Sequence, residues 1–411
     1  MRKMVALVLF AICSAIPLAA QDHSAVLAVS TLLDGRGGVL HDTRIVVENG
    51  KIVRIDPKAE PVALDLRGFT VMPGLIDTHV HISWHFGQNG TIDQKGPKDE
   101  TPQEQEWAAL QMASNAWKDL RAGFTTVQSV GADSEEPLRD AIDRGDLPGP
   151  KILTSLEPIH DPKLTPEQIR EAVRTLKADG ADEIKIFAST GLGSGGKPTL
   201  SQEQLDAACG EAKAVGLRSV VHAFGRAVGM SALAGCTSVE HGLMASDDDL
   251  RAMAEHGTYF DPQVALVFRN YIENRTRYPN INDQAIEILR DAIPQADALV
   301  ERAMKVPNLK IVFGTDAVAG AHGENARELV ARVREAHMPA MQALVGAQSL
   351  AAEALGMGGR IGSIAPGYDA DIIAVNGDPL ADITATERVV FVMKHGRVVR
   401  DDAVHAVHAV Q

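Results

Sequence analysis

The spacing of apolar residues changes twice along the chain. From residue 25 to 71, and again from 371 to 400, apolar and polar residues alternate in short runs. A period of two is typical of strands with one buried face. Asn49-Gly50 separates two such runs and predicts a tight hairpin. The expected strands are Ala25–Ser30, Arg44–Glu48, Lys51–Ile55, Thr70–Val71, Asp371–Val375, Val389–Lys394 and Gly396–Arg400. Because neither piece could bury a face alone, we expect both chain ends to pack together as one small β-sandwich.

Between these pieces, short apolar runs alternate with helical stretches. The expected strands are Val71–Ile76, Thr125–Val130, Lys151–Ser155, Asp182–Ala188, Arg218–Phe224, Thr237–Glu240, Thr258–Val264 and Lys310–Gly314. The expected helices are Gln103–Ala122, Thr165–Ala178, Ser201–Ala214, Ala227–Ala234 and Met338–Leu355, with an extra helical layer at Asp283–Lys305. Eight strands that alternate with helices predict an α/β fold of the (β/α)8 TIM-barrel type.

The length of 411 residues also predicts more than one domain. We expect the β-sandwich to comprise residues 21–70 and 360–403, the metal-binding barrel residues 71–359, and a C-terminal tail residues 404–411. The formal net charge of −14 argues against nucleic acid or an anionic membrane as a partner.

The first twenty residues have the pattern of a secretory signal peptide. Arg2 and Lys3 precede an apolar stretch at 4–16, and Pro17-Leu18-Ala19-Ala20 leads into polar residues. This predicts cleavage near Ala20 and a secreted or periplasmic protein. An uncleaved N-terminal anchor is the alternative, although the stretch is short for a bilayer. No later segment predicts a membrane span.

Two cysteines follow the predicted signal peptide, Cys209 and Cys236. An oxidising compartment would permit a disulfide between them. Because each lies in an apolar, helix-like run, we expect buried free thiols instead.

Candidate metal ligands fall at the ends of the predicted barrel strands, where active sites of such barrels lie. The first strand leads through Pro73-Gly74-Leu75-Ile76-Asp77 to His79 and His81. Histidines at i and i+2 of an extended segment point to the same side, so both can reach one metal.

Lys185 is flanked by Ile184 and Ile186 on the fourth strand. Burial of an ammonium group is costly and lowers its pKa. A neutral lysine can react with CO2 to give a carbamate, which is a carboxylate able to bridge two metals. If Lys185 is considered alone, the simpler interpretation is that its ammonium group reaches solvent at the end of the strand.

His222, His241 and Asp316 lie at the ends of strands five, six and eight. Single histidines on strands are usually core residues, and an aspartate there could cap a helix. However, all six groups fall at the same end of their strands, and this coincidence favours a metal centre.

This constellation resembles the amidohydrolase superfamily, from about Ala25 to Arg400. The family pattern is His-x-His on strand one, a carboxylated lysine on strand four, histidines on strands five and six, and an aspartate on strand eight. The resemblance implies two divalent metals, most often zinc. His79, His81 and Asp316 would bind one, His222 and His241 the other, and carbamylated Lys185 would bridge them. Asp316 would also be the catalytic proton carrier.

Within the superfamily, the segments around Lys185, His222-Ala-Phe-Gly, Val-Glu-His241-Gly and Gly-Thr-Asp316 are similar to the bacterial prolidase-like group. That group includes imidazolonepropionase-like and ochratoxin-hydrolysing proteins. The resemblance implies cleavage of the amide before a C-terminal amino acid, in a dipeptide, an N-acyl amino acid or an ochratoxin-type amide. Two features depart from the group: Phe224 replaces a tyrosine, and the segment 156–162 is short, which leaves His160 as the equivalent of a loop histidine.

Candidate contacts for the substrate are five residues on loops after strands: Arg226, His322, His160, Tyr271 and Arg269. The partner expected is a small amide or dipeptide, and a homo-oligomer is compatible with this type of barrel. Hydrolysis of a cyclic amide, lactone or phosphotriester, and deamination, are alternatives on the same scaffold. An inert binding protein is a further alternative, against which the complete ligand set argues.

Overall fold

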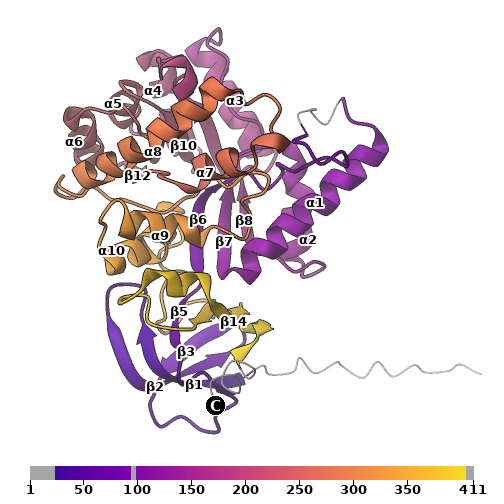
Figure 1. Ribbon diagram of the computed structural model, residues 1–411, viewed down its shortest axis with the longest axis vertical. Coiled ribbons are helices and arrows are strands. Elements are labelled where there is room, and N and C mark those ends of the chain that lie inside the picture. Colours follow the sequence, from indigo (N-terminus) through magenta and orange to yellow (C-terminus); the bar gives the residue numbers. More distant parts are fainter. Residues whose placement is uncertain (1–23, 94–98, 404–411) are drawn as a thin grey trace, which may run out of the picture.

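The structure of the chain is a computed structural model that describes residues 24–93 and 99–403. The predicted signal peptide and C-terminal tail therefore lie outside the described residues. The chain forms a sheet region from both of its ends and a larger region in which strands alternate with helices (Figure 1). The predicted α/β class is confirmed. Within the described ranges, no helix is long and apolar enough to cross a membrane.

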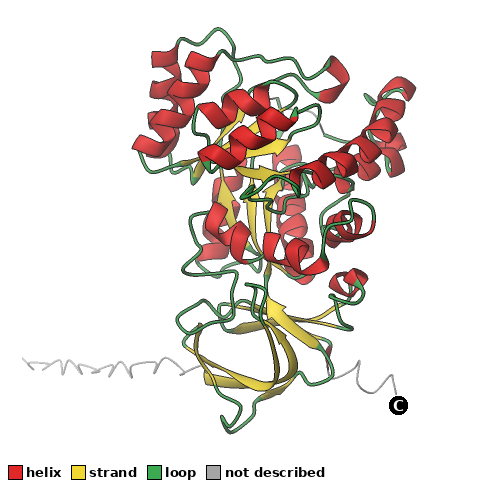
Figure 2. Cartoon of the chain, turned by 90° about the vertical axis from the view of Figure 1, so that its left-hand side faces the viewer, coloured by secondary structure: helices red, strands yellow, loops and turns green. Residues whose placement is uncertain are grey.

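Strands from the two chain ends pair in one eight-stranded sheet, at the bottom of Figures 1 and 2. They are β1 (Ser24–Leu33), β2 (Val39–Glu48), β3 (Lys51–Ile55), β4 (Leu64–Asp65), β5 (Thr70–Pro73), β13 (Ile372–Val375), β14 (Val389–Lys394) and β15 (Arg397–Asp401). Strand β5 joins the ends, because it pairs in parallel with β1 and antiparallel with β13. Asn49 and Gly50 both have positive φ, as a tight hairpin turn requires. The predicted pairing of the ends is observed, whereas a separate β-sandwich domain stays a prediction.

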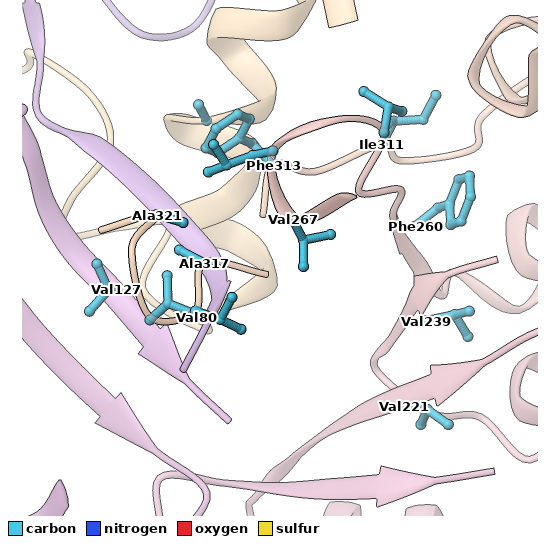
Figure 3. Close-up of a cluster of buried hydrophobic side chains, with 14 of the residues drawn as sticks. Val80, Val127, Val221, Val239, Phe260, Val267, Ile311, Phe313, Ala317 and Ala321 are labelled. Carbon is cyan, nitrogen blue, oxygen red and sulfur yellow. The ribbon is translucent and has the colours of Figure 1, made fainter. Parts of the chain in front are cut away.

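The larger region contains two parallel sheets. One has the order β6 (Leu75–Val80), β7 (Phe124–Ser129) and β8 (Lys151–Thr154). The other has the order β9 (Glu183–Phe187), β10 (Arg218–Ala223), β11 (Ser238–His241) and β12 (Tyr259–Asp261). Neighbours in these sheets follow each other in the sequence and all pair in parallel. Buried side chains from both sheets, including Val80, Val221 and Phe260, belong to one apolar cluster (Figure 3).

Backbone contacts join the two parallel sheets on both sides. Ile159, after β8, forms a parallel bridge with Ile186 of β9. On the other side, the segment 310–317 bridges to β12 through Ile311 and to β6 through Ala317. This segment contains the predicted eighth strand, Lys310–Gly314, which is not a regular strand. Its backbone departs from strand geometry at Asp316, where φ is +54°.

The first barrel strand differs from its predicted range of Val71–Ile76. Residues 70–73 belong to the end sheet as β5, and the strand β6 begins at Leu75. Gly74 lies between them, and a Cβ there would lie 2.1 Å from Thr125 Oγ1. The chain therefore passes from one sheet to the other at a glycine, which leaves His79 inside β6 and His81 just after it.

The helices lie largely where the sequence predicts them. They are α1 (Pro102–Arg121), α2 (Glu136–Asp143), α3 (Pro166–Ala178), α4 (Gln202–Ala214), α5 (Ala227–Leu233), α6 (Asp247–His256), α7 (Leu266–Glu273), α8 (Asp283–Ala303), α9 (Ala326–Arg334), α10 (Ala340–Gly346) and α11 (Ser349–Ala354). Capping boxes begin α1, α3, α4 and α6, in each of which a Ser or Thr side chain and the third helical residue exchange hydrogen bonds.

The prediction of one final helix at Met338–Leu355 is wrong, because this range contains two helices, α10 and α11. The carbonyl of Gly346 accepts a hydrogen bond from the Phe313 amide, and the carbonyl of Ala347 accepts one from the Ile76 amide. These carbonyls are therefore engaged by the neighbouring segments, and the helix is interrupted at Gln348, whose φ and ψ are −132° and −104°.

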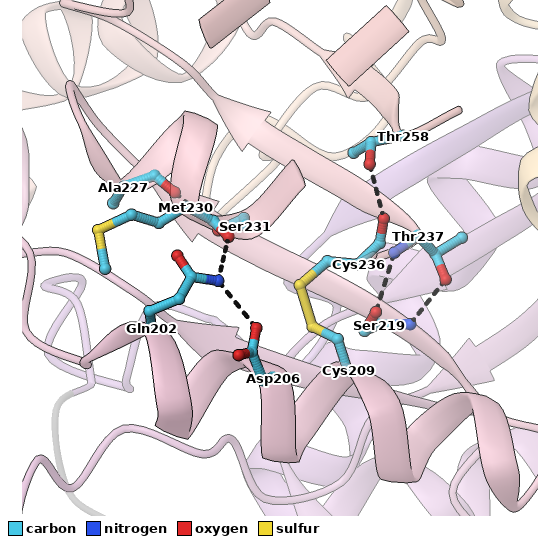
Figure 4. The surroundings of a disulfide bond; sticks show 10 residues. All are labelled: Gln202, Asp206, Cys209, Ser219, Ala227, Met230, Ser231, Cys236, Thr237 and Thr258. Atoms are coloured by element: carbon cyan, nitrogen blue, oxygen red, sulfur yellow. Dashed lines mark hydrogen bonds between the residues drawn. A yellow bond between two sulfur atoms is a disulfide. The ribbon is translucent and has the colours of Figure 1, made fainter. Parts of the chain in front are cut away.

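The prediction of free thiols is also wrong. Cys209 in α4 and Cys236 before β11 form a disulfide, and their Cα atoms are 5.0 Å apart (Figure 4). Both cysteines are buried. An apolar sequence context indicates burial, but it cannot tell a buried thiol from a buried disulfide, since only the packing of α4 beside residue 236 brings the two together.

We expect the double substitution Cys209→Ala/Cys236→Ala to lower the free energy of unfolding by about 3 kcal/mol, because the bond closes a loop across 27 positions. Denaturant unfolding checks this. A reducing agent should destabilise the wild-type protein and leave the variant unchanged. An equal response of both proteins to the reductant would contradict the cross-link.

Candidate active site

The six candidate ligands gather at one end of the parallel strands. His79 lies in β6 and His81 follows it. Lys185 lies in β9, His222 in β10, and His241 is the last residue of β11. Asp316 lies on the segment that joins β12 to β6.

Three of these side chains converge at one point. The Oδ1 atom of Asp316 lies 3.1 Å from Nε2 of His81 and 3.5 Å from Nε2 of His79. The ligand atoms of these three residues lie within 4.8 Å of one another. The Nζ atom of Lys185 is 3.4 Å from the same Nε2 of His79. The groups expected to bind the first metal are therefore together, with the lysine beside them.

The other two histidines lie next to this group. The ring centroids of His222 and His241 are 4.7 Å apart, and His241 is 5.4 Å from His79. The Phe224 ring is stacked on His241 with an angle of 2° between the planes and a separation of 5.2 Å. The structure thus brings all six predicted residues into one cluster, with Phe224 as an apolar wall.

The protonation of the cluster suits metal binding, which requires neutral imidazoles and an ionised carboxylate. Burial lowers the pKa of His222 to about 3, and it lowers those of His79 and His241 well below the ordinary value. Burial acts to raise the pKa of Asp316, but His79 and His81 outweigh it and lower the pKa to about 2.

Lys185 is the most unusual member of the cluster. It is 1% exposed, and within the described ranges its one hydrogen-bond partner is the His79 ring. Burial lowers its pKa, although Glu240 and Asp316 act in the opposite direction. A buried amine without a carboxylate in hydrogen-bond contact is costly as an ammonium. This environment fits a lysine whose nitrogen is neutral or chemically modified.

Asp77 links strand β6, which carries His79, to the segment that carries Asp316. Its carboxylate accepts hydrogen bonds from the amides of His79 and Thr315, from the Thr315 hydroxyl and from the Asn325 side chain. Thr315 precedes Asp316, so one buried carboxylate fixes β6 against the segment that carries the aspartate. Burial raises the pKa of Asp77 to about 8, although the hydrogen bonds from Thr315 and Asn325 lower it.

The five candidate substrate contacts have different environments. Arg226 and His160 are exposed. Arg269 forms an ion pair with Glu335. The ring of Tyr271 packs at 4.8 Å from that of Tyr278, and burial and the charge of Asp316 raise its pKa well above the ordinary value.

His322 differs most from the loop surface on which we expected it. It is buried, its Nδ1 lies 3.0 Å from Asp119 Oδ2, and its Nε2 lies 3.1 Å from the carbonyl of His81. Both ring nitrogens are therefore engaged by the protein, and His322 supports the backbone of a candidate ligand.

Sequence reasoning missed the polar residues behind the cluster, namely Asp77, Asp119, Glu240 and Gln263. Two of them had a usable signal, because Glu240 directly precedes His241 and Asp77 lies two positions before His79. Gln263 and Asp119 are remote in the sequence from any candidate ligand, so only the fold reveals their role.

Gly314→Ala should lower the free energy of unfolding by about 3 kcal/mol, since overpacking of a filled interior is destabilising. A Cβ at this position would lie 1.9 Å from Asp261 Oδ2 and 2.9 Å from Cβ of His79. Gly191→Ala is the matched control, because φ there is −68° and a Cβ meets nothing within 4 Å. Denaturant unfolding should place the control within about 0.5 kcal/mol of wild type. Equal stability of both variants would mean that the close approach is not a constraint.

The chain is similar to proteins of known activity over most of its length. The amidohydrolase family profile matches residues 70–399. Ochratoxinase from Aspergillus niger is 24% identical over 420 residues, which cover 89% of this chain and 85% of that protein. Imidazolonepropionase from Geobacillus kaustophilus is 25% identical over 430 residues, which cover 89% of this chain and 92% of that protein.

Solved structures agree with these similarities. A Xaa-Pro dipeptidase with methionine bound in its active site superposes with a TM-score of 0.80 at 31% identity, and the superposition covers 92% of this chain and 100% of that one. Because the family match extends over well more than half of the chain, this protein belongs to the amidohydrolase family, in its prolidase- and imidazolonepropionase-like group, and is a hydrolase of amide C–N bonds.

Proposed function

We propose that the protein is a binuclear-metal hydrolase that releases a C-terminal amino acid from a dipeptide or an N-acyl amino acid. The observation that carries this proposal is the convergence of five metal-competent side chains around the buried Lys185 at one end of the parallel strands. The similarity to a Xaa-Pro dipeptidase and to ochratoxinase supports the substrate class.

The scaffold of this site is proposed to be a closed (β/α)8 barrel. The two parallel sheets and the segment 310–317 provide eight stretches in sequence order, and backbone bridges link the sheets on both sides. The end sheet, with its own buried cluster around Leu27, Ile45 and Phe391, would be the accompanying β-sandwich.

Members of the family generally use divalent metals, and the donor set here fits two zinc ions. His79, His81 and Asp316 would hold one ion, and His222 and His241 the other. Lys185, carboxylated by CO2, would supply the shared carboxylate between them. Ions bound there would polarise the scissile carbonyl and acidify the attacking water.

Asp316 is the proposed proton carrier. Its carboxylate is 16% exposed, whereas the side chain of His79 is 1% exposed, so it lies toward the open side of the cluster. Since its pKa is low, it is ionised at neutral pH and can accept a proton from the attacking water. The same carboxylate would then donate the proton to the leaving nitrogen.

A cavity beside the site would receive an apolar acyl group. Its volume is about 840 Å³, and Trp84, Ile92, Met112, Leu138 and Leu147 are among the residues that line it. The Trp84 ring also lies 5.0 Å from the His81 ring, so this tryptophan is shared by the cavity and the proposed metal centre.

The carboxylate of the leaving amino acid requires a donor at the mouth of the site. Arg226 is the proposed partner, because it is exposed and follows Phe224 by two positions at the start of α5. Tyr271, which packs against Tyr278, would lie beside the reacting amide.

The proposed location is outside the cytoplasm. The sequence pattern of residues 1–20 is that of a signal peptide, and the Cys209–Cys236 disulfide is typical of proteins that fold in an oxidising compartment.

Hydrolysis of a cyclic amide is the second candidate function. The similarity to imidazolonepropionase, over 89% of this chain, favours it. A cyclic substrate would not require recognition of a free C-terminal carboxylate, so the two candidates differ in a way that a substrate panel can resolve.

We expect the zinc-loaded protein to cleave dipeptides and N-acyl amino acids that end in a free carboxylate, and to leave their C-terminal amides intact. Amine release measures this across C-terminal Pro, Phe, Leu, Arg and Lys, with a hydantoin or another cyclic amide included. Cleavage of the cyclic amide alone would replace the proposed substrate class.

The negative control for this substrate panel is the variant Asp316→Asn, which lacks the proposed proton carrier. Loss of the proton carrier should lower kcat by about 10²–10⁴-fold. Metal content must be measured in parallel, because Asp316 is also a proposed ligand. A turnover near that of wild type with both metals bound would refute the role of Asp316 as proton carrier.

Lys185→Met should reduce the bound zinc from two ions per chain to one or none, because the shared carboxylate is lost. Elemental analysis of the dialysed protein gives the stoichiometry. Lys197→Met is the control, since Lys197 is exposed on the loop that follows β9. Retention of two ions by Lys185→Met would exclude a bridging lysine.

A further inference from the structure

His79 differs from the other candidate ligands because both of its ring nitrogens have side-chain partners. Nε2 points toward Lys185 and Asp316, at 3.4 and 3.5 Å. Nδ1 lies on the opposite side of the ring, 2.8 Å from Oε2 of Glu240 and 3.3 Å from Nε2 of the Gln263 side chain. The side chains of His79 and Glu240 are each 1% exposed. The imidazole is therefore held between the proposed metal centre and a buried carboxylate.

Glu240 is fixed by donors on both of its oxygens. The Ser238 hydroxyl donates to Oε1 at 2.6 Å, and the Gln263 side-chain amide donates to Oε2 at 3.2 Å. The carbonyl oxygen of the Gln263 side chain in turn accepts the backbone amide of His241. The carboxylate is thus oriented by two residues of β11 and one that follows β12, and it cannot rotate away from His79 without breaking these bonds.

Asp261 extends this arrangement further into the protein. Its Oδ2 accepts a hydrogen bond from Thr78, the residue before His79, and its Oδ1 lies 3.0 Å from Nη2 of Arg332. Arg332 also pairs with Glu328 at 3.2 Å, and Glu328 accepts the amide of Leu266, the first residue of α7, and the two amides before it. All of these side chains are buried. The backing of His79 is therefore a continuous polar network that reaches two helices.

The ligand atoms of His79, Glu240 and Asp261 also lie within 4.8 Å of one another, as they would around an ion. Three contacts indicate that a proton between His79 and Glu240, and not a bound metal cation, occupies this point. The 2.8 Å separation of Nδ1 and Oε2 is that of a charge-assisted hydrogen bond. The Gln263 amide donates to the same oxygen, and the Arg332 guanidinium already supplies positive charge to Asp261.

The carboxylate is the nearer of the two partners of Nδ1 and can only accept, whereas the Gln263 amide donates to that carboxylate. Nδ1 of His79 therefore carries the proton and Nε2 the lone pair. We propose that Glu240, held by Ser238 and Gln263, is a positioning residue that fixes His79 as the Nδ1-protonated tautomer and directs Nε2 to the metal. This inference rests on the proposed metal function. According to this inference, Glu240 strengthens the binding of the ion at His79, His81 and Asp316, although Glu240 contacts neither the ion nor the substrate.

His81 provides the contrast. Its Nδ1 is buried, and within residues 24–93 and 99–403 it has no hydrogen-bond partner. Two histidines that are expected to bind the same ion are therefore oriented unequally. Hydrogen-bond partners of metal-binding histidines change metal affinity by about 10–100-fold. We therefore expect Glu240, as the partner of His79, to contribute most of this effect at the site.

The test is Glu240→Gln, measured as zinc affinity by competition with a chromophoric chelator. Glutamine leaves His79 a neutral carbonyl oxygen and places an NH2 group where Oε1 accepts from Ser238, so the charge-assisted bond is lost and we expect one of the two ions to bind about 10–100-fold more weakly. Asp371→Asn is the control, because it also neutralises a buried carboxylate, but in the turn before β13, where it accepts the His395 amide. The control should bind both ions like wild type.

Ser238→Ala is a second, milder variant in case Glu240→Gln does not fold. Loss of the 2.6 Å bond should weaken the same ion by several-fold and leave the other unchanged. Wild-type affinity for both ions in the variants of Glu240 and Ser238 that fold would overturn the positioning role. A wild-type protein that binds no zinc would instead refute the proposed metal function itself.

Discussion

The buried carboxylate of Asp77 is the contact on which both the fold and the site depend. It binds amide and side-chain donors from β6 and from the segment 310–317, which belong to opposite ends of the parallel region. Backbone hydrogen bonds also hold that segment, to β12 through Phe260 and to β6 through Thr78 and His79. Asp77 adds a side-chain attachment to these backbone contacts. Together with the hydrogen bond from the Asp316 amide to the His79 carbonyl, it sets the distance between His79 and Asp316.

The site was more predictable than its scaffold. The six candidate ligands could be named because each follows an apolar run, and the ends of parallel strands meet at one edge. The exact strands were less certain. Residues 71–76 read as one apolar strand, but the close approach of Gly74 to Thr125 divides them between two sheets. Likewise, residues 338–355 have the composition of one helix, and only the amides of Ile76 and Phe313 reveal why it is interrupted.

What the sequence could not provide were contacts between distant positions that carry no periodic signal. Cys209 and Cys236 appear apolar in context, and their bond depends on how α4 packs. Gln263 has the same limitation, because a single polar residue after a strand has no pattern that indicates which side chain it orients. His322 was expected on a loop surface, yet Asp119, from a helix 203 positions away, draws it into the interior.

The six candidate ligands are divided between the two parallel sheets. His79 and His81 belong to the β6 side, Lys185, His222 and His241 to the β9–β12 side, and Asp316 to the segment that joins them. Two metal ions bound there as proposed would hold the two sheets together as well as serve catalysis, because each sheet supplies only part of their coordination. The stability of this protein to heat and to proteases would then increase with the concentration of free metal. At low metal concentration the contact between the two sheets would weaken and the activity would be lost.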